Sequence, residues 1–179
     1  MRDLDEIVRM ALEAGFSLAA PLDLATIKLY PEVREMCASD KCRAYDRNWT
    51  CPPACGTLEE CSERIRKYNR GIIVQTLGEL EDDFDFEGMA ELAKKHNEKF
   101  YAFHDVLHGI FSDVLALGAG GCSRCDSCTY PDMPCRFPHL ALASMEAYGM
   151  IVNEVCTLNG VPYYHGPGKI AYIGCYLFD

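Results

Sequence analysis

The sequence predicts an α+β protein with a small, largely antiparallel sheet, several helices and two cysteine-rich metal-binding loops. Three observations lead to this prediction. Apolar residues recur at helical steps in several segments, short runs rich in β-branched and aromatic residues lie between them, and cysteines gather in two loops. Because 179 residues match the length of one ordinary domain, we expect a single cysteine-rich metal-binding domain over residues 1–179.

The first half of the chain is expected to begin with a helix and to contain a second one after a loop. Residues 3–15 place apolar side chains on one helical face before a glycine ends the pattern. Residues 36–57 are mostly loop, because polar residues and two adjacent prolines exclude regular structure. Thr57 and Glu60 have the form of a capping box, so a helix should run from there to about Tyr68.

A strand and a long helix are expected next. The run IIVQTL over residues 72–77 has the β-branched content of a buried strand, and the acidic stretch 79–85 follows it as a loop. From Met89 to Leu117 apolar side chains recur at steps of three and four, which predicts one long amphipathic helix. The glycines between 118 and 121 end it.

The last part of the chain is expected to contain a helix, a strand and a hairpin. The segment FPHLALASMEAYG over 137–149 predicts a helix that starts near Pro138, and MIVNEVC over 150–156 is strand-like. The segments 161–165 and 169–178 flank a Gly-Pro-Gly sequence, which predicts a hairpin whose turn needs a positive φ after the proline.

Eleven cysteines are several times the usual share for a chain of this size, and they indicate metal or redox chemistry rather than disulfides. Their number is odd, and MRDLDEIVRM lacks the charged and then apolar pattern of a secretory signal. A chain without an export signal normally stays in a compartment that keeps thiols reduced. We therefore expect a cytoplasmic protein.

Charge and hydropathy argue against two kinds of partner. The formal net charge is -10 and the 17 basic residues are scattered, whereas nucleic-acid binders need clustered Lys and Arg. No stretch approaches the roughly 18 to 20 continuous apolar residues of a membrane span. The acidic surface is compatible with a basic redox partner protein, and the sequence leaves the oligomeric state open.

The second cysteine group contains Cys122, Cys125 and Cys128 at steps of three, with Cys135 seven residues later. Three thiolates at this spacing let the backbone curl around an iron–sulfur cluster, so that each sulfur meets a different iron. Cys135 is the expected fourth ligand, because the two prolines between it and Cys128 stiffen the connecting loop. A structural zinc site is the alternative, since four thiolates satisfy zinc equally well.

The first cysteine group has five members within 25 residues, one more than a four-ligand site needs. Spacing alone does not select four of them. We choose Cys37, Cys42, Cys51 and Cys61, since Cys61 would lie at a helix N-terminus that favours the thiolate, and Cys55 is the competitor.

Other residues are expected to pack rather than to react. The pair His104 and His108 shares a helix face but borders an apolar stripe. Cys156 and Cys175 fall in predicted strands, and Cys175 alternates with apolar neighbours as a core residue does.

Long motifs around both groups resemble the DUF2284 family, whose members are described as predicted metal-binding proteins. The similar segments run from about Cys37 to the C-terminus and are CRAY (42–45), NWTCPPACGTLEEC (48–61), GGCSRCDSCTYP (120–131), PCRFPH (134–139) and SMEAYG (144–149). The resemblance implies that both cysteine groups belong to one module, and it carries no established reaction.

Three hypotheses for the function follow. The leading one is an iron–sulfur protein with two 4Fe-4S clusters, bound by the four chosen cysteines of each group, that carries or relays electrons. The second is a zinc-stabilised binding module without a redox role. The third is an iron–sulfur enzyme in which one cluster keeps an open coordination site for a substrate.

Overall fold

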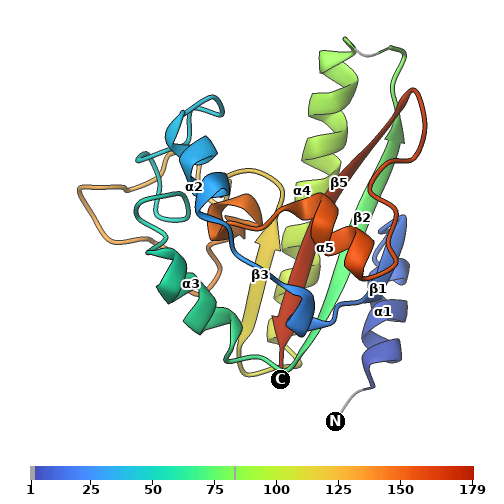
Figure 1. The fold of residues 1–179 in the computed structure, drawn as a ribbon, viewed down its shortest axis with the longest axis horizontal. Coiled ribbons are helices and arrows are strands. Elements are labelled where there is room, and N and C mark those ends of the chain that lie inside the picture. Colours follow the sequence, from blue (N-terminus) through green and yellow to red (C-terminus); the bar gives the residue numbers. More distant parts are fainter. Residues whose placement is uncertain (1–2, 83) are drawn as a thin grey trace.

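One five-stranded sheet forms the centre of the computed structural model, which describes residues 3–82 and 84–179 (Figure 1). The strand order is β1-β2-β5-β3-β4, and all neighbouring pairs are antiparallel except β3 and β4. The predicted α+β class with a largely antiparallel sheet is confirmed. The strands are β1 Leu18–Pro21, β2 Arg70–Glu79, β3 Val114–Gly118, β4 Ala143–Ser144 and β5 Lys169–Phe178.

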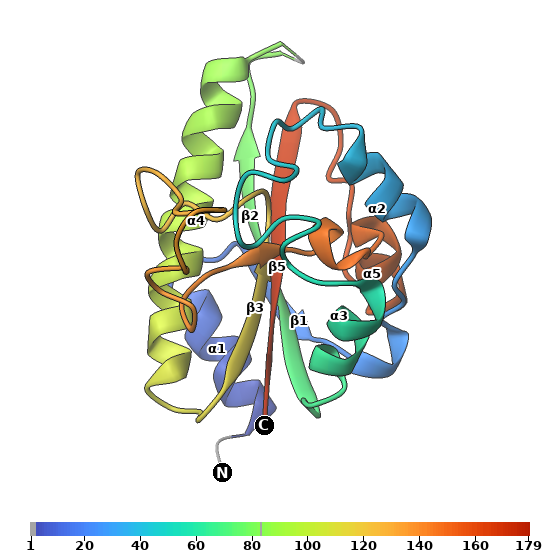
Figure 2. The same cartoon turned by 90° about the vertical axis from the view of Figure 1, so that its left-hand side faces the viewer.

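Helices cover both faces of the sheet. Seen along the sheet, α1 and α4 lie on one face and α2, α3 and α5 on the other (Figure 2). The helices are α1 Leu4–Glu13, α2 Pro31–Ala38, α3 Leu58–Ile65, α4 Phe86–His108 and α5 Val152–Leu158, with 3-10 turns η1 at Leu24–Thr26 and η2 at Glu146–Tyr148.

Alternate residues of the central strands divide the core into two clusters. In β2, Ile72 and Val74 pack with Phe100 and Phe103 of α4, whereas Ile73 packs on the opposite face. That opposite cluster also contains Cys61, Cys156 and Cys175. The period of two in β2 and β5 is the reason, because successive strand residues point to opposite faces. Cys175 is therefore a core residue, as predicted.

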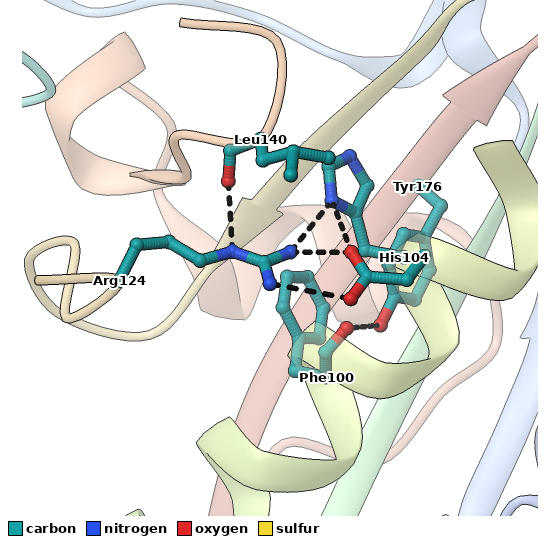
Figure 3. Close-up of polar contacts among 6 residues, drawn as sticks. Phe100, His104, Arg124, Leu140 and Tyr176 are labelled. Carbon is teal, nitrogen blue, oxygen red and sulfur yellow. Dashed lines mark hydrogen bonds and ion pairs between the residues drawn. The ribbon is translucent and has the colours of Figure 1, made fainter. Parts of the chain in front are cut away.

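Helix α4 sits directly on the backbone of the sheet because two strands carry glycine beneath it. A β-carbon at Gly118 would lie 3.1 Å from the Phe100 ring, and one at Gly174 would lie 2.9 Å from the Leu117 carbonyl oxygen. The buried hydroxyl of Tyr176 in β5 donates to the Phe100 carbonyl oxygen at 2.8 Å, as Figure 3 shows. Close packing and this hydrogen bond fix the position of α4 over β3 and β5.

Several local predictions are confirmed. The first helix and the strand over 72–77 are present, and the strand extends in both directions. The capping box is complete, since the Thr57 hydroxyl accepts from Glu60 N at 3.2 Å and a Glu60 carboxylate oxygen accepts from Thr57 N at 2.7 Å. The acidic loop predicted over 79–85 follows β2, although Glu79 still belongs to the strand and Asp83 lies outside the described residues. Gly168 has the expected positive φ, at 67°.

The predicted helix from Met89 to Leu117 is wrong in its second part. Helix α4 ends at His108, and Val114–Gly118 is strand β3. Residues 114–117 satisfy a helical step, yet they are also a continuous apolar run at the centre of a covered sheet. Gly109 at the C-cap separates the two elements.

Three predictions in the last part of the chain are also wrong. Residues 137–149 are mostly irregular and contain only β4 and η2 instead of a helix. Residues 150–156 contribute to α5 rather than to a strand, so Cys156 is helical; Val152, Val155 and Cys156 face the core at helical steps. The 161–165 arm of the hairpin is irregular and does not pair with a strand. It is held by the side chain of Gln75, which donates to the Pro162 carbonyl oxygen and contacts the His165 ring.

The sequence analysis did not predict α2, β1 or β4. Helix α2 matters for the site, because it carries Cys37 in its last turn. Both cysteine-bearing segments lie together beyond the β3 side of the sheet (Figure 1). In residues 3–82 and 84–179, no helix has both the length and the apolar character that a membrane crossing requires.

Candidate metal centre

All four cysteines of the second group line one small cavity. Cys122, Cys125, Cys128 and Cys135 surround it together with Trp49, Phe137, Arg124 and Arg136. The cavity volume is ≈ 30 Å³, which is enough for a single ion or water molecule. Cys128 is exposed and the other three thiols are partly buried.

Nested hydrogen bonds explain how Cys135 returns to the three earlier cysteines. Arg136 Nη1 donates to the Ser127 carbonyl oxygen at 2.7 Å, and the Thr129 hydroxyl donates to the Pro134 carbonyl oxygen at 2.9 Å. These bonds fold residues 127–136 into a closed loop. The predicted fourth ligand thereby lies beside the other three without help from a regular element.

Arg124 attaches this loop to α4. Its guanidinium makes two contacts with the Asp105 carboxylate, at 2.7 and 3.3 Å, and its Nε donates to the Leu140 carbonyl oxygen at 3.0 Å. Figure 3 shows Arg124 extended between Leu140 and His104. The guanidinium also lies 4.4 Å from the centre of the Tyr101 ring. One side chain therefore joins the start of the loop, the later segment at Leu140 and the long helix.

His104 completes this contact as a neutral acceptor. Burial, together with the neighbouring His108 and Arg124, lowers the pKa of His104 to about 4. A neutral imidazole can accept a hydrogen bond from Arg124, whose Nη2 lies 3.3 Å from His104 Nδ1. The expectation that His104 packs rather than binds metal agrees with its 1% exposure.

Tyr101, one helical turn before Asp105, holds the adjoining residue of the loop. Its hydroxyl oxygen accepts from Ser123 N at 2.7 Å and lies 3.1 Å from the Ser123 hydroxyl. Neither Tyr101 nor Arg124 was singled out from the sequence. The sequence offers little to indicate this contact: Arg124 lies between two cysteines of the triplet, and its partner Asp105 is an acidic residue on a helix surface. Exposed acidic residues are common in helices that hold no such loop.

The first group divides into two parts. Cys37, Cys42 and Cys51 line a cavity of ≈ 430 Å³. The pKa values of Cys37 and Cys51 are raised, mainly by burial; Cys42 raises both further, and Cys37 and Cys122 also raise that of Cys51. The thiols of this cavity therefore affect one another's ionisation, and Cys51 is also affected by a thiol of the second group.

The loop that carries Cys42 turns sharply to bring these thiols together. Asp40, Arg43 and Asp46 all have left-handed φ values, of 51°, 57° and 54°. The Asp40 carboxylate accepts from Tyr45 N at 3.1 Å and binds Arg47 at 2.7 Å. Non-glycine residues adopt this conformation at a cost that surrounding contacts offset, and aspartate tolerates it better than most.

Cys55 and Cys61 form the other part of the first group. Both are buried, Cys61 Sγ lies 3.9 Å from the Cys55 carbonyl oxygen, and Arg34 Nη1 lies 3.9 Å from Cys61 Sγ. The hydrogen bond from Cys55, with Arg34 and Arg64 nearby, lowers the pKa of Cys61 to about 7, while the pKa of Cys55 is raised. Arg34 also acts on Cys37, so it faces both parts of the group.

The two cysteine groups adjoin each other. A β-carbon at Gly121 would lie 3.8 Å from Cys51 Sγ, and Gly120 and Gly121 form part of the wall around Cys37 and Cys42. The indole N–H of Trp49 donates to the Met133 carbonyl oxygen at 3.1 Å. Trp49 also packs edge-to-face on Tyr130, whose hydroxyl donates to Asp46.

The donor chemistry of both groups fits a thiolate-bound metal. Each group supplies at least four cysteines, and the second places all four around one space. Across residues 3–82 and 84–179, no set of three or more His, Cys, Asp or Glu side chains is arranged to hold one metal ion. The helix predicted over 137–149, directly after the second group, is not formed, and the positive charge at that cavity comes from Arg124 and Arg136.

Comparisons with known proteins identify a family for nearly the whole chain. A search of curated proteins and a search of solved structures gave no match. The family model of DUF2284, described as a predicted metal-binding protein, matches residues 20–178. That range includes both cysteine groups and all five strands except the first two residues of β1. The chain belongs to the DUF2284 family of predicted metal-binding proteins.

Proposed function

We propose that this protein is an iron–sulfur protein that carries or relays electrons between two 4Fe-4S clusters. The observation that carries the proposal is the gathering of Cys122, Cys125, Cys128 and Cys135 around one cavity, directly beside the first group. Iron–sulfur clusters accept and release single electrons, and cysteine thiolates are their usual ligands. Adjacent sites are what an electron relay requires.

In this proposal the second cluster is held by the four cysteines just named and the first by Cys37, Cys42, Cys51 and Cys61. Arg124 and Arg136 bring positive charge to the second site, and Arg34 brings it to the first. Cations beside a thiolate-bound cluster stabilise its negative charge, and burial and hydrogen bonding tune its potential. Trp49 and Phe137 cover one side of the second cavity and limit the access of water.

A zinc-stabilised binding module is the second candidate. The ≈ 30 Å³ cavity of the second group favours it, because a single ion fits that volume whereas a four-iron cluster requires the loop to open. The repeated step of three residues among Cys122, Cys125 and Cys128 favours iron–sulfur, since zinc sites usually pair two Cys-x-x-Cys sequences.

The metal itself is the first test. Protein purified without oxygen is expected to be brown, with broad absorption at about 400 nm and about eight iron and eight sulfide per chain. Exposure to air should bleach it. Metal analysis by mass spectrometry and a colorimetric sulfide assay make the measurement. Colourless protein with stoichiometric zinc and no sulfide would contradict the proposal and favour the binding module.

The spare thiol of the first group is tested by a matched pair of variants. Cys55→Ala should keep nearly all of the iron, whereas Cys61→Ala should lose the iron of the first site. The reason is that Cys61 faces Arg34 and has the lower pKa, so it ionises more readily for ligation.

Iron analysis of the two purified variants, with circular dichroism as a check of folding, gives the comparison. The opposite result, in which Cys55→Ala alone loses iron, would show that the ligand is Cys55. Full iron in both variants would mean that neither thiol alone is required, and the Cys55→Ala/Cys61→Ala double variant would then show whether three cysteines suffice.

Separate sites are tested by Cys125→Ser. About half of the iron should be lost, and the electron paramagnetic resonance signal of the first site should persist, because each group has enough cysteines for four-fold ligation. Ser127→Ala is the control, since it lies in the same loop and only its carbonyl oxygen is used there. A folded Cys125→Ser protein without any iron would mean that the two groups form a single site.

A further inference from the structure

Besides the two cavities described above, which are lined by the second and the first cysteine group, a further cavity has a volume of ≈ 730 Å³. This is the size of cavities that bind small organic molecules, which span roughly 300 to 1,000 Å³. It lies against α3 and β3 and beneath the loop of the second group, and its wall includes Cys55, Arg64, Tyr68, Asp113, Cys135 and Tyr148. Cys135 lines both this cavity and the smaller cavity of the second group, and Cys55 is the member of the first group that the chosen ligand set leaves out.

Much of the wall is apolar. Residues 114–116 of β3 contribute, as do three prolines and Ala143. Trp49 lies at the side and is held by its hydrogen bond to Met133. A wall of this kind favours a ligand with an apolar body, because burial of apolar surface stabilises the bound state.

Two hydrogen-bond donors meet within this wall. Arg64 Nη1 donates to the Cys55 carbonyl oxygen at 2.8 Å and to the Tyr148 hydroxyl oxygen at 3.1 Å, which fixes the guanidinium in place. Burial raises the pKa of Tyr148, so the phenol stays protonated at neutral pH. Since its oxygen accepts from Arg64, its O–H remains able to donate. Arg64 and Tyr148 can therefore bind the same anionic group.

Negative charge at the rim restricts the rest of the ligand. Asp113 and Asp132 line the cavity and are both exposed. The Tyr68 hydroxyl donates to Asp113 Oδ2 at 3.0 Å and holds that carboxylate in position. A second anionic group on the ligand would be repelled there. The arrangement suits one negative charge deep in the cavity and a neutral body toward the rim.

We propose that this cavity is a binding site for a small organic monoanion with a flat apolar body, whose carboxylate binds Arg64 and Tyr148. The bound molecule would contact Cys55 and Cys135, one cysteine from each group. If the proposed electron-relay function holds, a small molecule bound in this cavity would lie in contact with a ligand of the second cluster, Cys135.

The test uses 2-naphthoate and its uncharged amide, 2-naphthamide, as probes in isothermal titration calorimetry with anaerobically purified protein. We expect one naphthoate per chain and much weaker binding of the amide. Arg64→Gln should weaken naphthoate binding by about ten- to a hundredfold, the usual effect of losing a charged hydrogen bond. Arg66→Gln is the matched control, because Arg66 is an exposed arginine next to the same helix end and should leave the affinity unchanged.

A further variant covers the case in which Arg64→Gln does not fold. Leu115→Trp places bulk into the cavity from β3, keeps both Arg64 hydrogen bonds and should also abolish binding. The proposal is overturned if naphthoate does not bind at about 10 mM, if the amide binds equally well, or if folded variants retain wild-type affinity. Iron and sulfide analysis of the same samples reports on the relay function separately, so failure of one is distinguishable from failure of the other.

Discussion

The ion pair between Arg124 and Asp105 joins the loop that carries four cysteines to the helix that packs on the sheet. Asp105 is 51% exposed, and pairs of this exposure contribute only about 1 kcal/mol or less. Its importance is geometric. The fork of the guanidinium fixes a loop that has no regular secondary structure, and the bond from Arg124 to the Leu140 carbonyl oxygen fixes the return of the same loop.

The sheet positions α4, α4 positions the loop of the second group, and that loop positions the first group. The glycines under Phe100 let α4 sit close to β3 and β5, and α4 then holds the second loop through Tyr101 and Asp105. That loop in turn holds the first one, through the contact of Gly121 with Cys51 and the hydrogen bond of Trp49 to Met133. The two groups thus share their support. Removal of metal from one group is expected to loosen the other group without emptying it.

The elements that sequence analysis predicted correctly are those with local signals. The capping box at Thr57 is satisfied by residues three apart, and the β-branched run in β2 indicates a strand on its own. The errors arise where tertiary contacts decide. Val114–Gly118 fits a helical step but becomes a strand because β5 pairs with it, and α5 is helical because its apolar residues then reach the core.

In the candidate site too, local sequence patterns indicated some residues, whereas others are brought together only by tertiary contacts. Cysteine spacing indicated the four residues of the second group, which the fold places around one cavity. Spacing could not show that Cys61 lies beside Cys55 while Cys37, Cys42 and Cys51 share another space, because residues 39–57 have no regular structure that would fix their relative positions. Arg34, Arg64 and Tyr148 are distant in sequence from the residues they contact, and only the fold brings them together.

In the proposed function, two neighbouring thiolate sites on one side of the sheet each hold an iron–sulfur cluster. Anomalous diffraction from crystals grown without oxygen, recorded on both sides of the iron absorption edge and of the zinc edge, distinguishes this arrangement from a zinc site and from a shared site. Two separate iron peaks are expected, one among Cys37, Cys42 and Cys51 and one among the four cysteines of the second group. A single peak shared by both groups, or peaks that appear only at the zinc edge, would contradict this arrangement.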